Sequence, residues 1–177
     1  MIKSIKSNCS LLYVLLLWMK KVFGEESNHA WAQLSPRIVT VSKGWSEAYG
    51  LFLKGEADMV LSYTTSPAYH LIAEQDSRFA AARFAEGHYQ QIEVAGVVQT
   101  SQQKQLARAF MEFMISEDFQ KIIPTTNWMY PVIAGEAVVP AEFDELIDPS
   151  PALLLEETSV AKQRKSWVDE WLEVMSR

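Results

Sequence analysis

Apolar side chains recur every three or four positions in several stretches of the chain, which is the spacing of amphipathic helices. The pattern predicts helices over residues 12–23, 28–34, 46–54, 106–115 and 160–175. Gly24 and Gly55 each follow basic residues, as is usual where a helix ends. Two apolar stripes should therefore face a core: Leu106, Ala109, Phe110, Phe113 and Met114, and Val160, Trp167, Val168, Trp171, Leu172 and Met175.

Shorter apolar runs with β-branched residues predict strands over 37–42, 58–63 and 89–98. The first two flank the helix predicted over 46–54, and this order favours an α/β sheet covered on both faces. A polar loop, TTSPAYH (64–70), follows the second strand. Because ligand sites in open α/β sheets gather beyond the carboxyl ends of strands, we expect a binding site at this loop.

Two prolines, Pro124 and Pro131, enclose an aromatic loop, TTNWMYP (125–131). Ser116 should start a short helix before this loop, and Pro124 should stop that helix. Another short helix is predicted over 142–147. The loop thus places an indole and a phenol among small polar side chains, outside regular structure.

The composition fits a globular chain and narrows the classes of partner. Of 177 residues, 49% are hydrophobic and 21% are charged, and the net charge is -6. Lys and Arg form no basic cluster, so nucleic acid is not an expected partner. Cys9 is the single cysteine, and the three histidines show no paired ligand spacing, so we expect no metal site.

The chain lacks the common catalytic motifs but carries aromatic rings in polar, turn-like surroundings. No GxSxG, Walker A, GxGxxG or HExxH pattern is present. The rings in turns are Trp45, Tyr63, Tyr69, Trp128 and Tyr130. A single such ring is most simply a lid over the core. Three such loops, each with hydroxyl or amide side chains beside the ring, indicate a small-molecule site with stacking faces.

Several segments resemble the C-terminal half of the periplasmic thiamine-binding proteins, the substrate-binding components of bacterial thiamine ABC transporters. The most specific are GWSEAYGLFLKGE (44–56) and LSYTTSPAYH (61–70). The likeness extends over AEGHYQQIEVAG (85–96), FMISEDFQKIIPTTNWMYPV (113–132) and AKQRKSWVDEWLEVMSR (161–177). It begins near Leu15 and reaches Arg177.

The resemblance implies the α/β fold of type II periplasmic binding proteins, here incomplete because most of the N-terminal lobe is missing. The ligand-binding positions that it implies are Trp45, Tyr63, Thr64, Thr65, Ser66, Tyr69 and Trp128. A flat pyrimidine would stack between Tyr69 and Trp128, and the cationic thiazolium would lie on aromatic faces. The expected partners are thiamine or its phosphates and a membrane permease. We expect a monomer without cofactor, metal or enzymatic activity.

The start of the chain departs from the family. Residues 1–14 do not match it, so we expect an unrelated extension, followed by 15–177 as part of a two-lobed protein with a lobe crossover near 85–98. The apolar run from Leu11 to Met19 lacks a cleavage motif and falls short of the ~20 residues that span a bilayer. We therefore expect an internal helix there and no export signal, although the family is periplasmic. Because the missing lobe carries ligand contacts, this chain alone should bind thiamine weakly or not at all.

Two alternative functions remain open. One is a binding protein of the same fold for another ligand, either another small cation such as a ferric ion or a polyamine, or a sugar. Iron is disfavoured because Tyr63, Tyr69 and His70 lack a liganding arrangement. The other is a thiamine-degrading enzyme, for which Cys9 is the one candidate nucleophile.

Overall fold

The computed structural model describes residues 10–133 and 139–176, most of whose regular structure is helical. These residues form two compact units, each built from segments that are distant in sequence. Unit 1 contains the described residues up to Ser62, Phe84–Gln91, and the described residues from Pro149 onward. Unit 2 contains Tyr63–Arg83 and the described part of Ile92–Asp148.

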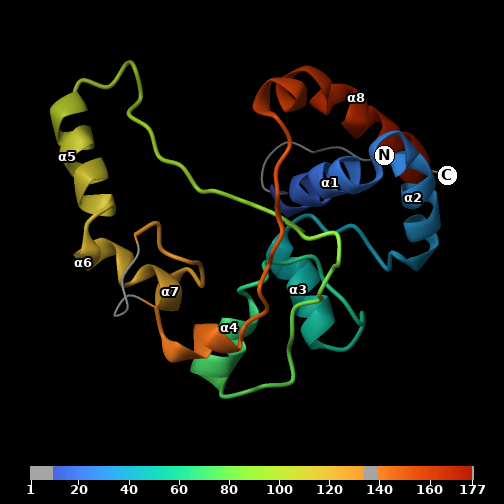
Figure 1. Ribbon diagram of the computed structural model, residues 1–177, viewed down its shortest axis with the longest axis horizontal. Coiled ribbons are helices and arrows are strands. Elements are labelled where there is room, and N and C mark those ends of the chain that lie inside the picture. The colour runs from blue at the N-terminus through green and yellow to red at the C-terminus, as the bar shows by residue number, and fades with distance from the viewer. Residues whose placement is uncertain (1–9, 134–138, 177) are drawn as a thin grey trace. The chain divides into compact units, whose positions relative to one another are not determined.

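Three helices pack together in unit 1: α1 (Ser10–Phe23), α2 (Ser27–Leu34) and α8 (Glu157–Met175). Figure 1 shows α1 and α2 in blue beside α8 in red. Lys20 and Lys21 occupy the last turn of α1, where positive charge favours the helix dipole. Gly24 then takes a φ of 54° and opens the 3-10 turn η1 (Gly24–Glu26). The helices predicted over 12–23, 28–34 and 160–175 are confirmed.

The core of unit 1 lies where these three helices meet. Its buried members are Leu16, Leu17, Met19, Trp31, Trp167 and Trp171. Trp31 is only 1% exposed. A buried indole removes a large apolar area from water, so the rings contribute heavily to the stability of this unit. The two tryptophans of α8 are packing residues, as their spacing predicted.

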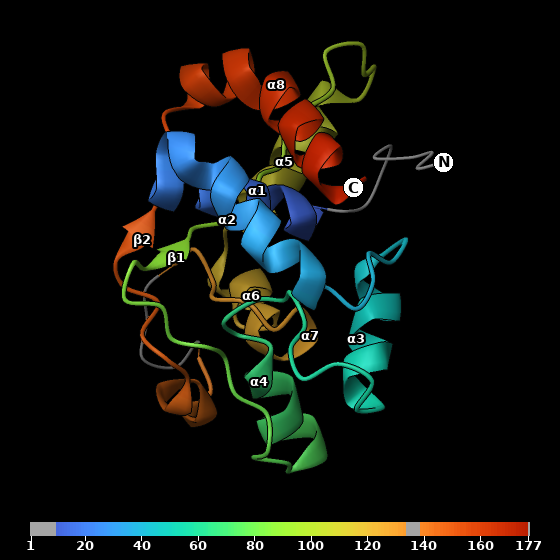
Figure 2. The same cartoon turned by 90° about the vertical axis from the view of Figure 1, so that its right-hand side faces the viewer.

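A short parallel sheet joins two distant segments of unit 1 (Figure 2). It pairs β1 (His88–Tyr89) with β2 (Ala152–Leu153), with His88 opposite Ala152 and Tyr89 opposite Leu153. Gly87 leads into β1 with a φ of 93°, and its carbonyl accepts a 2.8 Å hydrogen bond from the Trp18 indole. This bond ties the sheet to α1.

The remainder of unit 1 includes η2 (Ser35–Arg37) and α3 (Trp45–Leu53). At the start of α3, the Glu47 carboxylate accepts a 3.1 Å hydrogen bond from the backbone N–H of Lys43. Gly55 follows the helix with a φ of 76°, a conformation that glycine adopts without strain. The helix predicted over 46–54 is confirmed.

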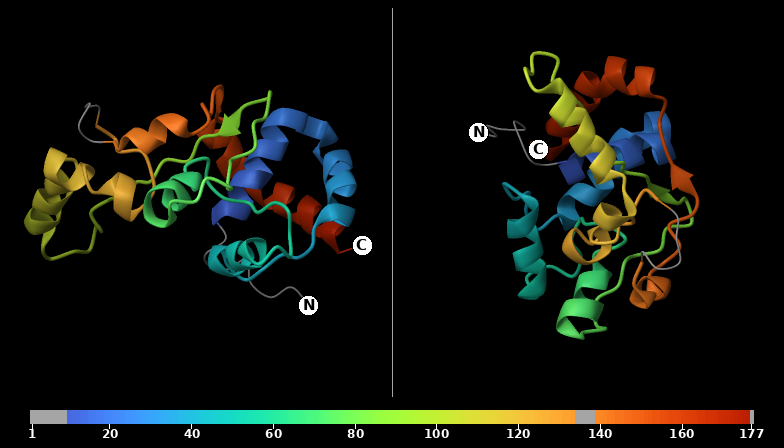
Figure 3. Two further views of the ribbon diagram at one scale, coloured as in Figure 1. Left: turned by 90° about the horizontal axis from the view of Figure 1, so that it is seen from below. Right: turned by 90° about the vertical axis from the view of Figure 1, so that its left-hand side faces the viewer.

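Unit 2 is built from short helices and turns. They are α4 (Pro67–Tyr69), the π-helix η3 (His70–Glu74), α5 (Lys104–Met114), α6 (Glu117–Gln120), α7 (Ile123–Thr126) and the 3-10 helix η4 (Ala141–Glu145). In both panels of Figure 3 the yellow helix α5 leads into α6. The Ser116 hydroxyl caps α6 by accepting a hydrogen bond from the Phe119 N–H. The helices predicted over 106–115 and after Ser116 are confirmed.

Two predictions about helix ends need correction. Pro124 does not simply stop the preceding helix: it lies in the first turn of α7, where the missing N–H of proline needs no partner. The helix predicted over 142–147 is a 3-10 helix that starts at Ala141. Its Phe143 is buried and contacts the Tyr130 ring edge to face.

The strands predicted over 37–42, 58–63 and 89–98 are wrong for the described structure, except that Tyr89 belongs to β1. Their apolar side chains are largely exposed, with Val39 at 66% and Val94 at 89%. A strand is stable only where neighbours pair its backbone and cover its apolar face. Among the residues described, β1 and β2 alone are paired as strands. Periodicity detects a segment suited to a sheet but not the presence of its neighbours.

The apolar stripe of α5 is also not buried as predicted. Leu106, Phe110 and Phe113 are 68%, 56% and 50% exposed, and Ala109 is exposed as well. Within the described part of unit 2, α5 packs mainly against α6 at its end. The stripe on α8 packs against two other helices, which bury Trp167 and Trp171, whereas no described helix covers the stripe of α5.

Within residues 10–133 and 139–176, no helix is both long and apolar enough to cross a membrane. In the same ranges, no three His, Cys, Asp or Glu side chains gather as a metal site. Cys9 lies outside the described residues, as does most of the extension predicted over 1–14. The division after residue 14 and the lobe crossover near 85–98 remain predictions.

Candidate functional site

The turn that carries Tyr69 is set by the residues on each side of it. Pro67 occupies the first turn of α4, and its fixed φ suits that position. The Ser66 carbonyl accepts a 3.3 Å hydrogen bond from the Tyr69 N–H. Beyond η3, Gln75 takes the left-handed conformation with a φ of 54° and ends the helical run. Tyr69 therefore lies at the junction of α4 and the π-helix, with 37% of its surface exposed.

Trp128 stands directly after α7 in a strained backbone conformation. Its φ is 56°, a left-handed value that costs a residue with a side chain about 1–2 kcal/mol. Strain of this kind recurs at ligand clamps and other functional sites, because the surrounding structure must enforce it.

Gln120 anchors the far end of the loop that carries Trp128. Its side chain is 6% exposed. The amide oxygen accepts a 2.8 Å hydrogen bond from the Val132 N–H, and the amide nitrogen donates a 2.7 Å bond to the Met114 carbonyl. The loop is thus fixed to the end of α5 through one buried side chain.

Unit 2 brings Tyr69 and Trp128 into direct contact. Their ring centroids are 5.2 Å apart and the rings are inclined by 78°, an edge-to-face arrangement. Two parallel rings around a third need about 7 Å between them, since aromatic carbons pack at about 3.5–4 Å. The sandwich predicted from the sequence is therefore not present in this structure. The two rings form a corner, in which a flat ligand can stack on one ring and meet the other at its edge.

The hydroxyl-rich run before Pro67 is engaged in its own turn. The Ser66 N–H donates to the Tyr63 carbonyl at 3.0 Å, and the Tyr63 N–H donates to the Ser66 hydroxyl at 3.2 Å. Thr65 is 4% exposed, and its hydroxyl donates to the Met129 sulfur at 3.6 Å. Thr64 is partly exposed. Thr65 thus links the segment that carries Tyr69 to the segment that carries Trp128. This structural contact is separate from the ligand contact predicted for Thr65.

A carboxylate lies beside the Tyr69 ring. Nδ1 of His70 and an oxygen of Glu74 are 2.6 Å apart. A hydrogen bond from the Tyr69 phenol to Glu74, and then the charge of that carboxylate, raise the pKa of Tyr69 above its ordinary value. His70 is fully buried and stacks on Phe79 at 3.9 Å.

A second carboxylate follows on the same segment. Arg78 donates to Asp76 from Nε at 2.9 and 3.0 Å and from the terminal nitrogen at 2.6 Å. These bonds hold the pKa of Asp76 at about 2. Asp76 is therefore ionised at neutral pH, and the guanidinium balances its charge.

Trp45, the remaining predicted ligand residue, belongs to unit 1. Its indole N–H donates to the Ser62 hydroxyl at 3.0 Å, and its ring lies 4.8 Å from that of Tyr49 at an angle of 34°. With 41% of its surface exposed, Trp45 offers an aromatic face at the start of α3. The ligand roles of Trp45 and of the six predicted residues in unit 2 remain predictions.

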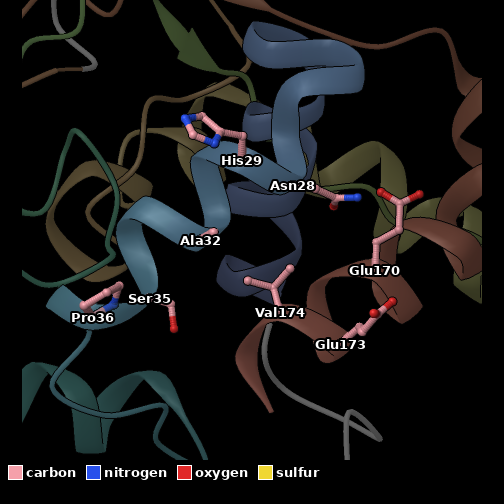
Figure 4. Close-up of a pocket in the computed structure, with 8 residues that line it drawn as sticks. All are labelled: Asn28, His29, Ala32, Ser35, Pro36, Glu170, Glu173 and Val174. Carbon is pink, nitrogen blue, oxygen red and sulfur yellow. The ribbon is translucent and has the colours of Figure 1, made fainter. Parts of the chain in front are cut away.

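A separate hollow of ≈ 440 Å³ lies in unit 1 between α2 and α8 (Figure 4). Its lining residues are Asn28, His29, Ala32, Ser35, Pro36, Glu170, Glu173 and Val174. Glu170 forms an ion pair with Lys20, and His29 is hydrogen-bonded to Gln33. The lining contains none of the predicted site residues and no Trp, Tyr or Phe ring, so its chemistry does not match the predicted stacking site.

Three side chains that shape the aromatic corner were not predicted from the sequence: Glu74, Gln120 and Met129. The spacing of His70 and Glu74, four positions apart, is a signal that could have identified their pairing. Met129 contacts Thr65, which is 64 positions away, and Gln120 bridges Met114 and Val132 without a recognisable motif, so the sequence offers no local signal for either.

The comparisons with known proteins agree on one protein family. Residues 21–121 match the family model of the bacterial extracellular solute-binding proteins. The thiamine-binding periplasmic protein of Escherichia coli K12 is 53% identical over 163 residues, which are 92% of this chain and 49% of the relative. The protein of the same name from Salmonella typhimurium LT2 is 54% identical over the same shares.

A solved structure is also similar to this chain, in sequence and in fold. A periplasmic thiamin binding protein aligns with a TM-score of 0.91 and 52% identity, over 95% of this chain and 52% of that chain. The fold is therefore that of the periplasmic binding proteins, as predicted, and the chain spans about half the length of the curated relatives it matches. These relatives are named as binding proteins and not as enzymes. This chain belongs to the family of bacterial extracellular solute-binding proteins.

Proposed function

We propose that this chain supplies the aromatic part of a thiamine site in a periplasmic solute-binding protein, which delivers thiamine or its phosphates to the membrane permease of an ABC transporter. The observation that carries the proposal is the corner formed by the exposed Tyr69 and the half-buried Trp128, whose rings lie 5.2 Å apart and whose tryptophan has a strained backbone. The names of relatives about half identical to this chain support the choice of ligand.

Thiamine has the chemistry that such a corner accommodates. Its aminopyrimidine is flat and can stack on one ring while it meets the edge of the other. Its thiazolium is cationic, and a cation on a Trp or Tyr face gains about 0.5–2 kcal/mol, more as the site is desolvated. Glu74 adds a carboxylate to the same segment and makes this surface more attractive to a cation.

The test is a calorimetric titration with thiamine and with thiamine monophosphate. Two proteins should be compared: the 177-residue chain, and a chimera that adds the part of the Escherichia coli relative that this chain does not match. We expect weak or absent binding by the chain alone and tight binding by the chimera. Trp128→Ala should weaken binding by the chimera about tenfold, equivalent to about 1.4 kcal/mol of lost stacking.

Phe110→Ala is the matched control, because Phe110 is an exposed aromatic residue of unit 2 that does not contact the corner. It should leave thiamine affinity unchanged. A chimera that bound thiamine equally well with and without the Trp128 ring would contradict the stacking role. Submicromolar binding by the 177-residue chain alone would contradict the expectation that the chain holds only part of the site.

A further inference from the structure

The loop that carries Trp128 starts and ends at one buried side chain, Gln120. It leaves α6, passes through α7 and reaches Trp128, whose φ of 56° lies in the left-handed region. Before this residue the chain is held by the Asn127 N–H, which donates to the Ile123 carbonyl at 2.9 Å. After it, the Val132 N–H donates to the Gln120 side chain at 2.8 Å. Trp128 therefore turns the chain between two fixed points.

The amide of Gln120 is fixed at both of its ends. Its nitrogen donates to the Met114 carbonyl at 2.7 Å, and Met114 is the last residue of α5. A flipped amide would set its nitrogen against the Val132 N–H and its oxygen against the Met114 carbonyl, so one orientation alone satisfies both contacts. Pro131 has no N–H, which makes Val132 the first backbone donor after Tyr130. The side chain thus joins the end of α5 to the end of the loop.

Burial makes this amide a firm restraint. Gln120 is 6% exposed. A polar side chain buried to this degree loses much stability when it is left without a partner, so the amide keeps the end of the loop in place. A left-handed backbone at a residue such as Trp128 persists only where the surrounding structure enforces it.

The loop has a second, weaker link close to Trp128. The Thr65 hydroxyl donates to the Met129 sulfur at 3.6 Å, and a thioether is a weak acceptor. The Trp128 and Tyr69 ring centroids lie 5.2 Å apart, and the rings are inclined by 78°. The two hydrogen bonds of Gln120 are therefore the stronger restraint on the loop that sets this angle.

We propose that Gln120 is a positioning residue of the ligand site: its amide fixes the end of the loop, keeps Trp128 in the left-handed conformation and thereby sets the contact with Tyr69. The relevance of this contact for ligand binding rests on the proposed function. Gln120 is buried, so it acts through Trp128 and not by touching the ligand.

The test compares Gln120→Met and Gln120→Glu with the parent in the full 177-residue chain without ligand. Methionine is close to glutamine in size and forms neither bond. A protonated carboxyl replaces both bonds, because its O–H can donate to Met114 and its carbonyl oxygen can accept from Val132, whereas an ionised carboxylate can only accept. Burial raises the pKa of a carboxyl above its ordinary value of about 4.3, so the change should occur between about pH 4.5 and pH 8.

Two NMR signals report on the loop, both assigned with Trp128→Phe. One is the cross-peak between the amide and α protons of Trp128, which is strong at positive φ, and the other is the set of cross-peaks between the Trp128 and Tyr69 rings. In Gln120→Met the first should weaken and the second should disappear. In Gln120→Glu both should match the parent at pH 4.5 and be lost at pH 8. Cross-peaks between Phe113 and Phe119, whose rings lie 5.5 Å apart, show whether α5 and α6 stay folded.

Gln99→Glu is the matched control, because Gln99 is an exposed glutamine of unit 2. It should behave like the parent at both pH values. His70 and Glu74, which are 2.6 Å apart, are also ionisable groups of this unit. Comparison with the parent and the control at the same pH separates their ionisation from that of the carboxyl in Gln120→Glu.

Each outcome decides for or against the proposal. It is overturned if Gln120→Met keeps both signals, or if Gln120→Glu lacks them at pH 4.5 or keeps them at pH 8. If Gln120→Met also loses the cross-peaks between Phe113 and Phe119, the pH series of Gln120→Glu alone decides. If Gln120→Glu loses those cross-peaks at pH 8 as well, Gln120 holds the fold of this region and not the loop, and the proposal is overturned.

Calorimetric titration of the chimera separates this inference from the proposed function. We expect Gln120→Met to weaken thiamine binding about tenfold, because the two rings lose their arrangement. If the unsubstituted chimera does not bind thiamine while the ring cross-peaks respond as expected, the proposed function fails and the positioning role stands. Unchanged thiamine affinity in Gln120→Met, with the cross-peaks lost, would overturn the role of Gln120 in ligand binding.

Discussion

Gly87 is the one glycine among the described residues at which an added Cβ would meet other atoms. Its φ of 93° belongs to the left-handed half of backbone space, and a Cβ built there would lie 2.2 Å from the Pro151 carbonyl oxygen. The same oxygen accepts the 3.1 Å hydrogen bond from the His88 N–H that begins the parallel sheet. Gly87→Ala therefore cannot be accommodated without separating β1 from β2.

The stability lost in Gly87→Ala is the sum of the backbone strain and of one broken hydrogen bond. A non-glycine residue in this conformation costs about 1–2 kcal/mol. Moving Pro151 away breaks the bond from His88, and moving Gly87 instead breaks the 2.8 Å bond from the Trp18 indole, each worth about 1 kcal/mol. We expect Gly87→Ala to lower the free energy of unfolding by about 3 kcal/mol, which corresponds to a fall in melting temperature of roughly 10 °C.

Urea unfolding followed by tryptophan fluorescence is the suitable assay, because every tryptophan except Trp128 belongs to unit 1. Gly50→Ala is the control: Gly50 lies within α3, and no atom approaches its added Cβ within 4 Å. Alanine should stabilise that helix by about 0.5–1 kcal/mol. A Gly87→Ala protein that unfolds within 0.5 kcal/mol of the parent would refute the geometry described for the entry to β1.

Two further changes test other parts of the structure. The pKa of Glu156 is lowered to about 2, first by the Thr158 hydroxyl and then by the backbone N–H groups of Thr158 and Ser159 at the start of α8. A lowered carboxyl pKa stabilises the fold above the ordinary value near 4.5 and loses that effect as pH falls toward 2. Glu156→Gln should therefore be less stable than the parent at pH 7, and urea unfolding at pH 2.5 should show a smaller difference. Phe110→Gln should change the free energy of unfolding by less than about 0.5 kcal/mol in the same urea assay, because Phe110 is 56% exposed. Replacement of a buried phenylalanine would lower the free energy of unfolding by about 3–5 kcal/mol.

The helices were predictable because their signals are local. In α8, the apolar spacing predicted a stripe facing the core; Trp167 and Trp171 are buried, and the other members of the stripe are partly buried against them. In α1, the lysines followed by Gly24 predicted the end of the helix within one turn. Capping groups, glycine and apolar spacing act within a few residues, so a single sequence contains them.

The strands and the α5 stripe were not predictable because they depend on neighbours. The segment 37–42 alternates like a strand, yet Val39 and Val41 are exposed and no described strand pairs with them. Phe110 lies on an amphipathic helix whose apolar face the described residues leave open. A pattern of apolar positions shows that a surface is suited to burial, and only the tertiary structure decides whether another element covers it.

The aromatic site combines both kinds of information. Proline on each side of the loop predicted that Trp128 leaves regular structure, and it does, whereas Tyr69, predicted in a polar loop, ends the helix α4 and leads into the π-helix. The angle between the rings was not predictable, because it depends on the left-handed backbone of Trp128 and on tertiary contacts of its loop. The difference matters for recognition. A sandwich would select any flat ring, whereas a corner presents one aromatic face and one edge of opposite electrostatic sign. Under the proposed function, such a corner binds a ligand that has both a flat ring and a positive charge more tightly than a ligand that has a flat ring alone.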